Sequence, residues 1–171
     1  MSDRYVELAR ATIEQYIRTG TIPEVPKDLP EEMLKEQAGA FVSLHRQGRL
    51  RGCIGTIQAT QSNIAKEIIS NAISASTRDP RFRPLREEEL DDLEISVDVL
   101  GRAERVSSLE DLDVKRYGVI VTKGYRRGLL LPDLEGVDTP AQQVGIALMK
   151  AGLSENERDF ILERFEVIRH T

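Results

Sequence analysis

The residues whose types could support chemistry lie in Arg49-Leu50-Arg51-Gly52-Cys53-Ile54-Gly55-Thr56, which contains the only cysteine of the chain. Glycines on both sides of a cysteine remove side chains where a ligand or a second backbone could approach closely. A nearby arginine supplies fixed positive charge, which stabilises a thiolate. The pattern therefore predicts a catalytic or adduct-forming role for Cys53. Arg51 would lower the thiol pKa, and Gly52 and Gly55 would give access to the backbone.

A structural role for Cys53 is the alternative, because an unpaired cysteine is among the most buried residue types and often serves as a small apolar filler. A nucleophile also needs a general base within reach. The sequence offers Glu67, Asp79 and Tyr125 for that role and does not choose among them.

A second group of candidate residues lies in the segment Arg78-Asp79-Pro80-Arg81-Phe82-Arg83-Pro84, which two prolines make rigid. The planar fork of arginine suits phosphate and carboxylate groups. We therefore expect an anion-binding set made of Arg51, Gly52, Gly55, Arg78, Asp79 and Arg81. Asp79 is also expected to cap the turn before Pro80. Solvated arginines, or arginines paired with the many acidic residues, are the alternative.

The cysteine segment is expected to form the second strand of a β-hairpin, with Ala40 to His45 as the first strand and Gln47-Gly48 at the turn. If Arg46 pairs with Arg49, alternation decides which residues share a face. One face would carry Val42, Leu44, Arg51, Cys53 and Gly55, and the other Phe41, His45, Leu50 and Ile54. In that register, Cys53 and His45 point away from each other.

Other elements follow from hydrophobic periodicity and from turn residues. An amphipathic helix is expected from Ser2, its N-cap, to Thr19, with Gly20 as the stop, and a proline-containing strap follows over residues 21–30. Further helices are predicted over 62–76 and 139–150, strands over 93–100 and 164–169, and a second hairpin from 119–121 and 129–131. Separate hairpins and helices without βαβ alternation indicate an α+β fold with a largely antiparallel sheet.

Composition limits the function classes. A chain of 171 residues with 40% hydrophobic content is expected to form a single domain, and its net charge of −5 argues against a nucleic-acid binder. One cysteine and two histidines cannot supply an ordinary zinc site, and the glycines follow no nucleotide-binding pattern, so no metal and no particular cofactor is predicted. The absence of a signal sequence and of a long apolar run predicts a cytoplasmic protein without a membrane span.

Four motifs, in order, resemble the AMMECR1 family: Leu50-Arg51-Gly52-Cys53-Ile54-Gly55, Asp79-Pro80-Arg81-Phe82-Arg83-Pro84, Gly128-Leu129-Leu130-Leu131-Pro132 and Lys150-Ala151-Gly152-Leu153. The resemblance implies an α+β domain over residues 1–171 with a larger and a smaller lobe, and a cleft near the cysteine motif. It also implies an association with a MEMO-like protein and a radical-SAM protein, since members are often encoded beside them. It does not supply a reaction.

Two functional hypotheses follow. In the first, the protein is an enzyme or enzyme subunit that binds an anionic small molecule beside Cys53. In the second, it is a non-catalytic module whose cysteine motif shapes a groove for a MEMO-like or radical-SAM partner.

Overall fold

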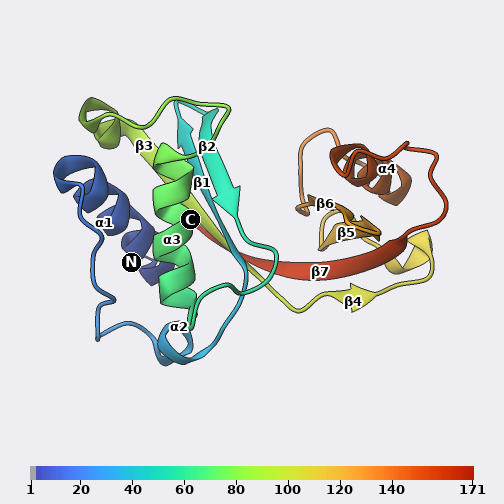
Figure 1. Cartoon of the computed structure of the whole chain (residues 1–171), viewed down its shortest axis with the longest axis horizontal. Coiled ribbons are helices and arrows are strands. Elements are labelled where there is room, and N and C mark those ends of the chain that lie inside the picture. Colours follow the sequence, from blue (N-terminus) through green and yellow to red (C-terminus); the bar gives the residue numbers. More distant parts are fainter. Residues whose placement is uncertain (1–2) are drawn as a thin grey trace. The chain divides into compact units, whose positions relative to one another are not determined.

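The structure is a computed structural model that describes residues 3–171, and the chain divides into two compact units. The first unit contains the described residues up to Leu100 together with Ile168–Thr171, and the second contains Gly101–Val167. Figure 1 shows the elements of each unit. The α+β fold with antiparallel sheet and flanking helices is as the sequence predicts.

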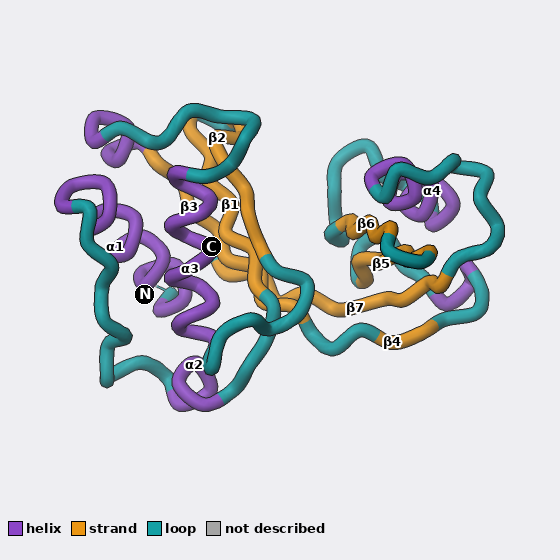
Figure 2. The backbone as a smooth tube through the Cα atoms, viewed as in Figure 1, coloured by secondary structure: helices purple, strands orange, loops and turns teal. Residues whose placement is uncertain are grey.

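The first unit packs helices on one face of an antiparallel sheet of order β2-β1-β3 (Figure 2). Its elements are α1 (Arg4–Thr19), α2 (Glu31–Lys35), β1 (Ala40–Arg46), β2 (Arg49–Gly55), α3 (Ile64–Thr77), the 3-10 helix η1 (Glu87–Asp92) and β3 (Leu93–Leu100). The core lies between the sheet and the helices α1 and α3, and Ile13, Val42 and Ile68 in it are completely buried. The sequence pattern did not predict the short helix α2.

The ends of the predicted helices in this unit shift by one or two residues. Asp3 caps α1 by accepting hydrogen bonds from the backbone N–H groups of Tyr5 and Val6, whereas the predicted cap, Ser2, lies outside the described residues. Gly20 ends the helix in the left-handed conformation, as predicted. Asn63 caps α3, so this helix begins after the predicted residue 62.

In the second unit, β7 pairs with β4 on one side and with β5 on the other, and β6 lies beyond β5. Its elements are β4 (Glu104–Arg105), the 3-10 helix η2 (Leu109–Asp111), β5 (Tyr117–Lys123), β6 (Arg126–Leu130), α4 (Pro140–Lys150) and most of β7 (Ile161–His170). The predicted second hairpin is therefore present. Helix α4 packs on β5 and β6 around a core that includes Val119, Val121, Ala147 and Leu148.

The first hairpin has the predicted turn but not the predicted register. Arg46 lies opposite Arg49, and a β-bulge then shifts the pairing, so that Leu44 faces Gly52 and Ser43 faces Cys53. Because a bulge inserts one extra residue in one strand, alternation changes phase after it. The predicted face assignment for Cys53 is therefore wrong: Cys53 shares a face with Ser43, and by alternation along β1 with His45.

Candidate functional site

The Cys53 thiol lies on β2, half-buried, with its Sγ 3.2 Å from the hydroxyl oxygen of Ser43 on β1. Burial raises the pKa of this thiol above its ordinary value, and the opposing contributions of the Ser43 hydrogen bond and the Arg81 charge are smaller. A raised pKa keeps the thiol protonated at neutral pH. The free protein therefore holds Cys53 as a neutral thiol, contrary to the prediction of a stabilised thiolate.

Asp79 connects the rigid loop to the cysteine strand. Its side chain is 2% exposed, and its Oδ2 accepts a hydrogen bond from the backbone N–H of Cys53 at 3.0 Å. Its Oδ1 accepts from the backbone N–H of Arg81 at 3.1 Å, which closes the predicted turn around Pro80. Hydrogen bonds from the Arg81 guanidinium hold the pKa of Asp79 well below its usual range. Asp79 is therefore an ionised anchor of the loop.

Arg81 is held on this anchor with part of its guanidinium still open. Its Nε and Nη2 donate to the Asp79 carboxylate at 3.0 and 2.8 Å, and Nη2 also donates to the carbonyl oxygen of Cys53 at 3.2 Å. The side chain is 55% exposed, and within residues 3–171 its Nη1 has no hydrogen-bond partner. The guanidinium carbon lies 5.4 Å from the centre of the Phe82 ring. Arg81 is thus a fixed cation beside the thiol with donors left for a ligand.

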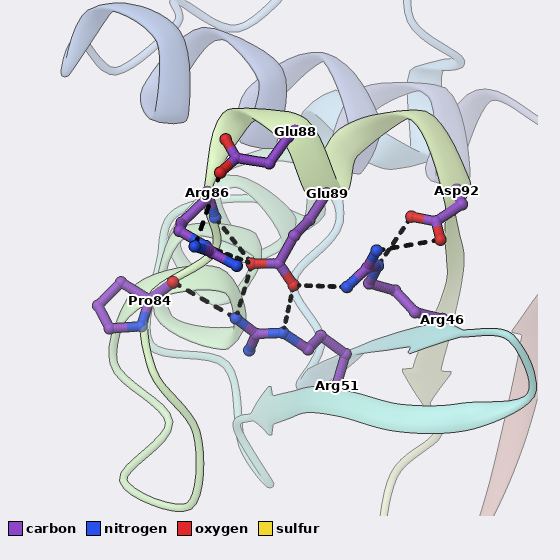
Figure 3. Close-up of polar contacts among 7 residues, drawn as sticks. All are labelled: Arg46, Arg51, Pro84, Arg86, Glu88, Glu89 and Asp92. Carbon is purple, nitrogen blue, oxygen red and sulfur yellow. Dashed lines mark hydrogen bonds and ion pairs between the residues drawn. The ribbon is translucent and has the colours of Figure 1, made fainter.

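Arg51 is committed to a different cluster, shown in Figure 3. Its Nε donates to Glu89 Oε2 at 2.8 Å and its Nη2 to Glu89 Oε1 at 3.2 Å, and Nη2 also reaches the carbonyl oxygen of Pro84 at 3.3 Å. The same carboxylate accepts from Arg46 Nη1 at 3.0 Å. Hydrogen bonds from Arg51, with support from Arg46, lower the pKa of Glu89 to about 2. Arg51 therefore neutralises Glu89, and the prediction that it activates Cys53 is wrong.

The glycines beside the cysteine leave room for other parts of the protein. A Cβ at Gly52 would lie 2.3 Å from the carbonyl oxygen of Ala75, so the missing side chain lets β2 pack against the backbone of α3. A Cβ at Gly55 would lie 2.2 Å from the ring of Phe41, which covers this glycine from the neighbouring strand. The sequence allowed either a ligand or a second backbone to approach these glycines, and at Gly52 it is the backbone of α3 that does so. At the positions where their side chains would be, neither glycine is open to a ligand.

The other three candidate residues, Arg78, Glu67 and Tyr125, have different surroundings. Arg78 ends α3, with its backbone N–H donating to Ser74 at 2.8 Å, and its side chain lines a groove formed with residues 22–25. Glu67 is completely buried and accepts hydrogen bonds from Thr56, Thr60 and Gln61. Its carboxylate therefore fixes a loop. Tyr125, which is 91% exposed, belongs to the second unit.

Sequence reasoning missed two residues of this region. Ser43 bonds to the thiol only because the bulge brings it opposite Cys53, and no local signal marks a bulge in this strand. Glu89 is one of three consecutive glutamates, and only the fold distinguishes it from its exposed neighbours.

Within residues 3–171, no group of three or more histidine, cysteine, aspartate or glutamate side chains is arranged to hold a metal ion. No helix in that part of the chain is both long and apolar enough to cross a membrane.

An antiparallel α+β fold with a Gly-Cys-Ile-Gly strand bound to an Asp-Pro-Arg loop defines the class of protein. The sequence model of the AMMECR1 family matches residues 6–170, and the chain belongs to that family. A protein of Thermotoga maritima is 52% identical over 97% of this chain and 96% of its own length. Another, from Clostridium acetobutylicum, is also 52% identical, over 98% of this chain but only 36% of its own length. The crystal structure of the uncharacterized protein PH0010 from Pyrococcus horikoshii superimposes with a TM-score of 0.90 at 34% identity, covering 96% of this chain and 88% of that one.

Proposed function

We propose that the protein binds an anionic group of a small molecule, a carboxylate or a phosphate, at Arg81 beside the neutral thiol of Cys53. The observation that carries the proposal is the partly satisfied guanidinium. Asp79 holds Nε and Nη2 in place, while Nη1 has no partner within the described residues and the side chain is 55% exposed. A rigid arginine with free donors is suited to planar anions.

The state of the thiol limits what this site does. Because burial raises the pKa of Cys53, the free protein does not hold a thiolate ready for attack. A bound anion would leave the thiol protonated, since negative charge nearby also disfavours the thiolate. The site is therefore proposed as a binding site in which Cys53 and Ser43 form one wall, and any covalent step would need a group from outside this chain.

The proposal is tested by alkylation of Cys53 with a charged and a neutral reagent. Iodoacetate carries the carboxylate that Arg81 should attract, whereas iodoacetamide does not, and mass spectrometry follows the single cysteine directly. For each thiol, we divide the rate of alkylation by iodoacetate by the rate of alkylation by iodoacetamide. We expect this ratio to be several-fold higher for Cys53 than for the thiol of free glutathione. Inorganic phosphate should lower the iodoacetate rate selectively.

Two variants and a control connect the effect to Arg81. Arg81→Gln should abolish the preference for iodoacetate, and Arg81→Lys should keep part of it because the charge remains. Arg83→Gln removes an exposed cation of the same loop that makes no ion pair within residues 3–171, and should leave the ratio unchanged. Circular dichroism and the thermal midpoint show that each variant is folded. A rate ratio equal to that of glutathione in the native protein would refute the proposal.

A second candidate function is supported by the Clostridium acetobutylicum relative, because this chain spans only about a third of that protein. A module that occurs within a longer polypeptide in one organism is a candidate for working with separate partners in another. We propose, as the second candidate, that the chain is a partner-binding module for MEMO-like and radical-SAM proteins. Purified partners from the same organism are titrated calorimetrically with the native protein, Arg51→Ala and Cys53→Ser. Unchanged affinity in both variants would exclude the cysteine motif from the interface.

A further inference from the structure

A groove in the first unit lies between the strap that follows α1 and one side of α3. Its volume is about 540 Å³, within the range of small-molecule sites. It is lined by Ile22, Pro23, Glu24 and Val25 from the strap, by Lys66, Ile69, Ser70 and Ile73 from α3, and by Gln61 and Arg78. Figure 1 shows the strap as the blue loop that leaves the end of α1. The Asp79–Arg81 site described above shares none of these residues.

Most of the groove surface is apolar. Ile69 and Ile73 are 6% and 4% exposed and belong to the hydrophobic core, whereas Ile22 on the strap is 63% exposed. An isoleucine that leaves most of its surface in water gains free energy when a ligand covers it. The groove therefore favours a ligand with an apolar body.

The charges on the groove favour an anion. Lys66 and Arg78 both line it, and neither forms an ion pair within residues 3–171. Glu24 is the only acidic lining residue, so the groove carries a net charge of +1 on a protein whose net charge is −5. Lys66 and Arg78 are twelve residues apart, which along the helix axis is about 18 Å. Either cation can therefore hold the single anionic group of a ligand whose apolar part extends along the groove.

The groove walls are held in place before any ligand binds. The buried carboxylate of Glu67 accepts the backbone N–H of Gln61 at 3.0 Å, and the side chain of Gln37 donates to the carbonyl oxygen of Gln61 at 3.0 Å. At the other wall, Pro23 restricts the strap and Thr21 is hydrogen-bonded to the side chain of Gln15 at 3.0 Å. Fixed walls lower the ordering cost of binding.

We propose that this groove binds a free aliphatic carboxylate of medium chain length, with its alkyl chain over Ile22, Ile69 and Ile73 and its carboxylate at Lys66 or Arg78. The chemistry follows from the apolar floor and the two cations. The proposal is independent of anion binding at Arg81, because the two sites use different residues.

The probe is decanoate, and titration calorimetry measures its binding at concentrations well below those at which it forms micelles. Butyrate has the same carboxylate with little apolar body, and decyltrimethylammonium has the same chain with the opposite charge. We expect saturable one-to-one binding of decanoate, and binding at least tenfold weaker for both comparison ligands. Equal binding of decyltrimethylammonium, or no saturable decanoate binding, would overturn the proposal.

Variants locate the binding. Ile22→Ser should weaken decanoate binding about tenfold, because it removes one exposed isoleucine from the wall. Ile168→Ser is the matched control, since Ile168 is 65% exposed in the same unit and does not line the groove. Lys66→Gln or Arg78→Gln should weaken binding several-fold, whereas Lys27→Gln, an exposed lysine outside the groove, should not. Decanoate affinity that is unchanged in Ile22→Ser and in both charge variants would overturn the proposal.

Other occupants of the groove would give different results. If a second copy of the chain covered it, sedimentation would show a dimer that Ile22→Ser dissociates. If the groove faced a membrane, vesicles of anionic phospholipid would bind the native protein but not Ile22→Ser, while free decanoate would not compete. Either result would replace the proposal.

Discussion

Replacement of Glu89 by glutamine tests whether the arginine cluster in the first unit stabilises the fold. The Glu89 side chain is 7% exposed and accepts hydrogen bonds from Arg51 and Arg46. Its pKa is lowered from 4.5 to about 2. A difference of about 2.5 units corresponds to roughly 3 kcal/mol of stability, at about 1.4 kcal/mol for each unit. Glu89→Gln is therefore expected to lower the free energy of unfolding at pH 7 by roughly that amount.

The pH dependence has a definite sign. A carboxylate whose pKa is lowered in the folded state contributes its full stability above the unfolded pKa, and the contribution is lost as the pH falls through the folded value. The difference between the native protein and Glu89→Gln should therefore be constant above about pH 5 and shrink between about pH 4.5 and 2. Urea unfolding, followed by circular dichroism at several pH values, measures this difference.

The control is the neighbouring glutamate. Glu88 on the same 3-10 helix is 69% exposed and its carboxylate lies 3.7 Å from the Arg86 guanidinium. An exposed pair contributes little, so Glu88→Gln should cause a much smaller loss with little dependence on pH. Equal losses in the two variants, or a loss in Glu89→Gln that persists unchanged at pH 2, would show that the cluster is not the source of the stability.

Three further predictions concern packing, the thiol and a partly buried ion pair. Gly52→Ala should destabilise the protein by about 1–3 kcal/mol, because its Cβ would overlap the Ala75 carbonyl. Gly145→Ala in α4, whose Cβ would make an ordinary contact with the Cβ of Glu155 at 3.8 Å, should stabilise it by about 0.5–1 kcal/mol; thermal unfolding compares the two variants. The pH profile of Cys53 alkylation by iodoacetamide should have its midpoint above the ordinary value of about 8.5, and Arg51→Ala should not raise that midpoint. Asp98→Asn should cost about 1.5 kcal/mol in urea unfolding, because the buried Asp98 carboxylate accepts a hydrogen bond at 2.8 Å from the Arg169 guanidinium, whose 38% exposure lets water screen the charge; a loss under about 0.5 kcal/mol would contradict this.

Elements defined by local patterns were predictable from the sequence. The first hairpin forms because Gln47 and Gly48 both adopt positive φ values, of 52° and 76°, as a tight two-residue turn requires. The helix stop at Gly20 and the N-terminal proline of α4 follow equally local rules.

The pairing register around Cys53 was not predictable, because the bulge that sets it occurs together with contacts to residues that are distant in the sequence. The bulge leaves Arg51 as the extra residue of β2, bonded to Glu89, and it places Gly52 where the backbone of α3 passes. Glu89 and Ala75 lie 38 and 23 positions away in the sequence from these two residues. Periodicity within one strand carries no information about such partners, so simple alternation placed the thiol on the wrong face.

Each of the unusual residues around Cys53 makes a different structural contact. Gly52 admits the backbone of α3, Gly55 lies under Phe41, and Arg51 neutralises Glu89. Three of the features that suggested a reactive thiol are therefore explained by packing and charge pairing. What these contacts leave open is Arg81, which is fixed by Asp79 and still partly exposed. If the motif has a ligand, recognition depends on the Asp-Pro-Arg loop, with the cysteine strand serving as its support.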